Sequence, residues 1–132
     1  MADFPSQDTF RVTGASLGGV SFDNTVGGSI TETVTFLEDR PGARLSPASC
    51  IDAYGCVAEV KFQKPTTPAV RGTKASVTFN LKTISGSSAQ ISVDNMLAGA
   101  YKADFNSKPH SHTQEATYDA GDAENLAPIS AS

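Results

Sequence analysis

Two histidines near the C-terminal end have the spacing that best suits metal chemistry. His110 and His112 stand in the stretch His-Ser-His-Thr-Gln-Glu, which ends at Glu115. In a strand, alternate side chains point to the same side, so both imidazoles could reach one ion. Glu115 would point to the opposite side, and catalytic metal sites commonly use three protein ligands. Because the chain has only 2 histidines, we predict no metal and no cofactor, with His110 and His112 as the candidate ligands if an ion were bound.

The same stretch resembles the first motif of the cupin family, which reads His-x-His, three or four residues, Glu, six residues and Gly. Here two residues separate His112 from Glu115, and five separate Glu115 from Gly121. A third cupin histidine would have to follow His112, and none does. The resemblance implies a metal-dependent cupin-like β-barrel enzyme, which is one alternative for the function.

A group of acidic and amide side chains lies in Asp-Ala-Gly-Asp-Ala-Glu-Asn, residues 119–125. Their oxygens are of the kind that bind calcium, but the EF-hand loop pattern is absent. We therefore predict a solvated acidic turn. The chain also has no phosphate loop and no dinucleotide fingerprint, and we expect a protein that is not an enzyme.

The elements that must position these residues are β-strands. Apolar and polar side chains alternate with a period of two, which is the pattern of strands with one buried face. The alternation is found in residues 8–14, 17–23, 29–38, 56–62, 74–82, 89–93 and 110–119. We predict an all-β fold, an antiparallel β-sandwich or barrel. It would have one long loop at residues 39–55, an irregular stretch at 101–109 and at most two short helical turns, at 46–54 and 94–99.

Length and composition indicate one domain. The 132 residues carry a net charge of -4, and the Lys and Arg residues are scattered singly, so we expect no sequence-specific nucleic acid binding. We expect no secretory leader, and no apolar run reaches the roughly 20 residues that cross a bilayer. We also expect an N-terminal arm at residues 1–7 and a C-terminal tail at 120–132 that reaches a neighbouring copy. Cys50 and Cys56 are expected as free thiols, with a disulfide between them left open.

The supply of core residues is small. Val, Ile, Leu and Phe together make up 27 of 132 residues, about the 20% below which highly charged chains tend to be disordered. We therefore expect self-association to complete the burial of apolar surface. The long loop is the expected contact element, because long loops in small domains are often functional. Its alternative is to fold over its own sheet. The predicted interaction residues are Phe4, Arg40, Arg44, Leu45, Ile51, Tyr54 and Ile129.

The chain resembles small structural proteins of tailed bacteriophage virions, in particular tail-tube subunits. The shared features are the short N-terminal arm, the antiparallel strands, the long loop after an early strand, the Thr/Ser-rich surface and the acidic net charge. The resemblance implies copies that form rings and stack into a tube. In it, the loop and arm bridge neighbouring rings, and an acidic lumen lets DNA pass. It also implies other virion proteins as partners, no membrane, and a place in the virion after assembly in the host cytoplasm. A capsid decoration or cement protein is the other alternative.

Overall fold

The computed structural model describes residues 10–22, 24–39, 48–106, 110–121 and 126–132. All regular structure in these ranges is β, which confirms the all-β prediction. Within them, no helix has the length and apolarity to cross a membrane. The eight strands are β1 (Arg11–Leu17), β2 (Val20–Phe22), β3 (Thr25–Asp39), β4 (Ala48–Phe62), β5 (Lys74–Lys82), β6 (Ser88–Asp104), β7 (Ser111–Tyr118) and β8 (Ile129–Ala131).

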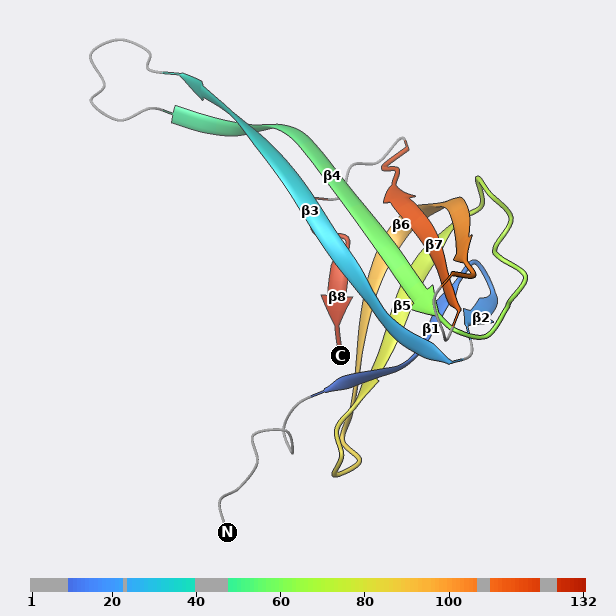
Figure 1. Ribbon diagram of the computed structural model, residues 1–132. Helices are drawn as coiled ribbons and strands as arrows, with labels where there is room; N and C mark the ends of the chain where they lie inside the picture. The colour runs from blue at the N-terminus through green and yellow to red at the C-terminus, as the bar shows by residue number, and fades with distance from the viewer. Residues whose placement is uncertain (1–9, 23, 40–47, 107–109, 122–125) are drawn as a thin grey trace.

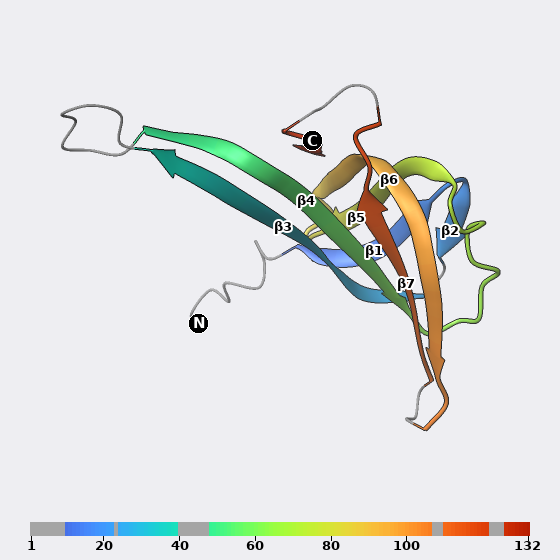
Figure 2. The same cartoon turned by 90° about the horizontal axis from the view of Figure 1, so that it is seen from above.

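The strands form one antiparallel sheet in the order β2-β1-β5-β6-β7-β4-β3. The short strand β8 pairs with Ile91–Val93 of β6, whereas β7 pairs with β6 from Met96 onward. The sheet is strongly curved, and the β3–β4 hairpin projects well beyond the other strands (Figures 1 and 2). The curvature brings β3 back close to β1. The two strands do not pair, so the sheet stays open at this seam.

The core lies on the concave side of the curved sheet. In β4, Cys56, Ala58, Val60 and Phe62 are buried in alternation, as the sequence predicts. The Phe62 ring packs against Phe22 with their centroids 4.7 Å apart. The opposite sides of the sheet approach very closely at Gly28, where an added Cβ would lie 2.4 Å from the Phe79 ring. The absence of a side chain at this position therefore allows β3 to close over β5.

The prediction of a long loop over residues 39–55 is wrong for the part that the structure describes. β4 begins at Ala48, and its ladder with β3 runs to the pair Asp39 and Ala48. The alternation was hidden by a β-bulge, because Thr35 pairs with Ala53 while Phe36 pairs with Ile51. The extra residue shifts the period by one. Residues 40–47 lie outside the described residues.

The predicted helical turns are also wrong where they can be examined. Residues 48–54 belong to β4, and residues 94–99 belong to β6. Asn95 has a φ of 60°, and the register with β5 shifts between Ala75 and Val77. A residue in the left-handed region at a register shift is typical of a bulge, and Asn tolerates that conformation. Residues 101–104, predicted as irregular, continue β6.

The two ends of the chain differ in what is described. The predicted N-terminal arm, residues 1–7, lies outside the described residues. In the C-terminal tail, Ile129–Ala131 pair with Ile91–Val93 of the same chain, and Pro128 is fully buried.

The tight β1–β2 turn is formed by Gly18 and Gly19, which have φ values of 60° and 82°. Two-residue hairpin loops of this kind require positive φ values.

Candidate assembly surface

The outer part of the β3–β4 hairpin is the least supported element of the fold. β7 pairs with β4 only between Val57 and Phe62. Beyond that point the hairpin continues as a two-stranded ribbon, which we call the arm: residues 32–39 of β3 and 48–56 of β4. Neither strand of the arm has a further strand beside it among the described residues. Isolated two-stranded hairpins are at best marginally stable in water, so the arm is expected to need a partner.

The two faces of the arm differ in chemistry. Residues directly opposite each other in a ladder share a face. Through this register, the face continuous with the buried side of β4 carries Val34, Phe36, Ile51 and Tyr54 together with Glu32 and Glu38, while the other carries Thr33, Thr35 and Ala53 together with Leu37 and Cys50. The exposed fractions are 59% for Phe36 and 42% for Ile51. We call the first face the apolar face of the arm. Such a contiguous exposed apolar surface commonly marks a site of interaction.

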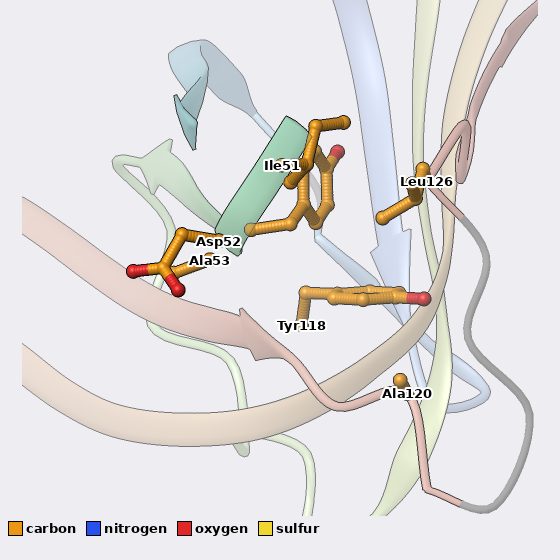
Figure 3. Close-up of a pocket in the computed structure, with 7 residues that line it drawn as sticks. Ile51, Asp52, Ala53, Tyr118, Ala120 and Leu126 are labelled. Carbon is orange, nitrogen blue, oxygen red and sulfur yellow. The ribbon is translucent and has the colours of Figure 1, made fainter. Parts of the chain in front are cut away.

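A groove lies between the base of the arm and the segment after β7 (Figure 3). It has a volume of about 160 Å³. Tyr54 and Tyr118 meet edge to face across it, with centroids 5.5 Å apart, and the side chains of Ile51, Tyr118 and Leu126 surround its opening (Figure 3). Leu126 is 49% exposed. The groove therefore extends the apolar face of the arm onto the body of the protein.

Glu32 and Tyr54 form a polar contact within this apolar face. The Tyr54 hydroxyl donates a hydrogen bond to the Glu32 carboxylate at 2.7 Å. Burial raises the pKa of Tyr54 well above its usual range, and the hydrogen bond to Glu32 raises it further. The phenol is therefore a neutral donor near pH 7. This contact fixes the Tyr54 ring at the base of the arm, so part of the apolar face is ordered before any partner arrives.

The arm is acidic. Its residues include Glu32, Glu38, Asp39 and Asp52, and no Lys or Arg. Residues 40–47 add Arg40 and Arg44, so residues 32–56 have four negative and two positive charges, a net charge of -2. Glu32, Glu38 and Asp52 are all exposed. A partner surface for the arm should therefore combine apolar side chains with positive charge.

The two cysteines lie on the hairpin and are both free thiols. Cys50 is exposed in the arm, whereas Cys56 is 1% exposed at its base. Burial raises the pKa of the Cys56 thiol, and the nearby charge of Glu32 adds to the effect. The expected free thiols are therefore what the structure contains.

The two candidate metal ligands have different environments. His112 is 2% exposed, with its ring stacked on Phe62. Its Nδ1 shares a hydrogen bond with the Tyr101 hydroxyl, and its Nε2 is buried with no hydrogen-bond partner among the described residues. His110 is exposed and packs its ring edge to face with Phe105. No group of three His, Cys, Asp or Glu side chains suited to a metal occurs in the described part of the chain.

The predicted interaction residues are only partly gathered by the fold. Ile51 and Tyr54 line the groove together. Ile129 lies elsewhere, in β8, where it is half-buried against the core. Phe4, Arg40, Arg44 and Leu45 lie outside the described residues. Val34, Phe36 and Leu126 also belong to this surface and were not predicted from the sequence. Glu32 lies on the same side of residues 29–38 as Val34 and Phe36, and a charged residue there indicates that this side is in contact with solvent.

Sequence reasoning also missed one motif. Gly-Ala-Ser-Leu-Gly, residues 14–18, has the Gly-x-Ser-x-Gly spacing of a nucleophile elbow. That device places its serine on a sharp turn between a strand and a helix. Here Ser16 lies inside β1, paired with Ser21 and Thr78. The motif therefore lacks the local structure that exposes a nucleophile.

Comparisons with known proteins identify the fold. No family model matches the sequence, and no curated protein matches it. Among solved structures, a chain of the anti-feeding prophage cap (AFP tube terminating cap) is similar, with a TM-score of 0.64 and 12% identity over 100% of this chain and 93% of that chain. A chain of the anti-feeding prophage (AFP) baseplate has a TM-score of 0.55 and 11% identity over 100% of this chain and 97% of that chain. The chain thus shares the fold of these chains of the anti-feeding prophage cap and baseplate.

Proposed function

We propose that this chain is a self-assembling structural protein of a phage-tail-like particle, and that its copies form the stacked rings of a tail tube. The observation that carries the proposal is the arm of the β3–β4 hairpin, residues 32–39 and 48–56. A two-stranded ribbon with an exposed apolar face has no core of its own to hold it, and a neighbouring copy would supply one. The role is structural, and no catalytic step is part of it.

Two further observations support this role. The similar chains come from structures of a tube terminating cap and of a 6-fold symmetrised baseplate, and the match covers the whole of this chain. The net charge of -4 also suits a lumen through which DNA passes without binding. The partners would then be further copies and other proteins of the particle, which assembles in the host cytoplasm.

Electron microscopy of the purified protein at rising concentration tests this function. We expect rings with a central hole, and stacks of rings or tubes at the highest concentrations. Small closed oligomers without a hole would instead favour the alternative of a capsid decoration protein. A monomer at every concentration would contradict the proposal, since the arm would then need no neighbour.

A further inference from the structure

The connection between β4 and β5 presents an apolar and a basic side chain next to each other. Val70 is 75% exposed, the largest exposed fraction among the large hydrophobic residues that the structure describes. Arg71 follows it and is also exposed. The Arg71 Nη1 lies 3.5 Å from the carbonyl oxygen of Ala69, so the guanidinium stays close to the backbone beside Val70. No acidic side chain of the described residues is paired with Arg71. We call residues 70–73 the Val70 turn.

The Val70 turn is held firmly against the sheet. The Thr73 N–H donates to the Val70 carbonyl at 3.0 Å, and Gly72 has a φ of 88°. Both features are typical of a type II turn with glycine at its third position. The Gly72 N–H donates to a carbonyl of β6 at 2.8 Å, and the buried Gln114 side chain bonds to the N–H and the C=O of Ala69. Little further ordering would therefore be needed when a partner binds this turn.

The apolar face of the arm has the complementary chemistry at a matching spacing. Phe36 and Ile51 are a cross-strand pair on this face, and Glu38 lies two residues beyond Phe36 on the same face. All three side chains are exposed. Alternate residues of a strand are roughly 7 Å apart, which neighbouring side chains such as Val70 and Arg71 can span. An apolar contact and an ion pair can therefore form side by side.

The arm and the Val70 turn lie at opposite ends of the molecule. Figures 1 and 2 both show the arm projecting from one side of the body and the connection between β4 and β5 on the other side. The turn of one molecule therefore cannot cover its own arm, whereas the turn of a second copy can. A contact between two different surfaces of identical molecules is head-to-tail, and such contacts close into rings or extend into filaments.

We propose that the apolar face of the arm of one copy binds the Val70 turn of a second copy. This inference rests on the proposed function and names the surface that the arm would contact. Val70 packs on Phe36 and Ile51, and Arg71 pairs with the Glu38 carboxylate. The two surfaces are complementary in charge as well as in apolar character, because the arm is acidic and the turn is basic.

Exchange of the two charges tests the contact. Arg71→Glu and Glu38→Lys each place like charges opposite each other, so each should weaken self-association, measured by sedimentation velocity, on the order of threefold to tenfold. In a 1:1 mixture, every contact between unlike variants joins opposite charges, so association should recover toward the wild-type level. A single chain with both changes should associate as the wild type does. Failure of both the mixture and the double variant to recover would overturn the Val70 turn as the partner of the arm.

Removal of the apolar side chain tests the other half of the contact. Val70→Ser should weaken self-association on the order of tenfold, because a buried valine is lost from the interface. The matched control is Ile84→Ser, which removes a side chain that is 68% exposed in another connection of the sheet. Lys82→Glu is the control for Arg71→Glu, since it makes the same change in net charge. Both controls should associate as the wild type does, and urea unfolding checks that each variant is folded. Equal association of Val70→Ser and Ile84→Ser would contradict the proposal.

The outcome also separates this inference from the proposed function. If Val70→Ser and Arg71→Glu have no effect while loss of the arm abolishes association, the inference fails, the arm makes its contact elsewhere and the structural role stands. If the wild-type protein does not associate at any concentration, both proposals fail.

Discussion

At the scale of single residues, β7 contains two buried polar side chains in very different states. Gln114 is fully buried, and its side-chain amide exchanges hydrogen bonds of 3.1 Å with both the N–H and the C=O of Ala69. It thereby holds the connection between β4 and β5 against the sheet. His112, two residues earlier, has one ring nitrogen that no group in the described part of the chain bonds. An unsatisfied buried polar atom costs about 1–3 kcal/mol.

Replacing His112 by Phe should therefore be close to neutral or stabilising by up to about 1 kcal/mol. The substitution removes the unpaired Nε2 and keeps a ring against Phe62, whereas the half-buried Tyr101 hydroxyl can bond to water. His112→Ala should cost about 2–4 kcal/mol, because it leaves a cavity. Urea unfolding measures both. If His112→Phe lowers the free energy of unfolding as much as His112→Ala does, then Nε2 has a partner in solution, such as an ion, and is not an unsatisfied atom.

The two thiols should react at very different rates. Cys50 is exposed, whereas Cys56 is buried and its pKa is raised, so a smaller fraction is present as the reactive thiolate. With a colorimetric disulfide reagent at neutral pH, we expect one thiol to react in the folded protein and the second only on unfolding. Cys50→Ser should remove the fast phase alone. Two fast phases in the native protein would contradict the buried position of Cys56.

At the scale of elements, the close approach of β3 and β5 depends on one glycine. A Cβ at Gly28 would lie 2.4 Å from the Phe79 ring and 2.6 Å from the Glu59 carbonyl oxygen, whereas one at Gly27 would have no atom within 4 Å. Gly28→Ala should thus destabilise the fold by about 1–3 kcal/mol through overpacking. Gly27→Ala is the control and should change stability by less than about 0.5 kcal/mol. Equal effects would mean that β3 does not rest on Phe79.

The sequence predicts the body of the sheet better than it predicts the arm. In residues 56–62 and 74–82, burial on one face imposes the alternation, so the strands are recognised easily. In residues 48–55 the bulge at Asp52 breaks the alternation, and no core selects one face. The pattern of that stretch is therefore typical of a loop, although two residues in it that the sequence marks as interaction candidates, Ile51 and Tyr54, line the same groove.

The apolar groove where β3 closes over β1 and β5 could not be predicted in the same way. Its residues come from four strands that are far apart in the sequence, and only the curvature of the sheet brings Val12, Ile30 and Ile91 together. Curvature depends on bulges and on the close approach at Gly28. A single sequence shows a bulge only as a break in the pattern.

At the scale of the whole molecule, the core is thin partly because several large apolar side chains lie on the exposed arm instead. Phe36, Leu37 and Ile51 are exposed large hydrophobics, while the chain has no Trp and few large core residues. Apolar side chains placed on the arm rather than in the core stabilise the protein only when another surface covers them. The stability of this protein is therefore expected to rise with its concentration.

The arm's role is tested most directly by shortening the hairpin. Thr35 and Ala53 are a cross-strand pair, so residues 36–52 can be replaced by the turn Asn-Gly, which favours a two-residue hairpin loop. The variant keeps Glu32, Tyr54 and the body of the sheet. Sedimentation velocity of this variant and the wild type over the same concentrations gives the result. We expect the wild type to associate and the shortened protein to stay a folded monomer. Equal association of the two proteins would contradict it.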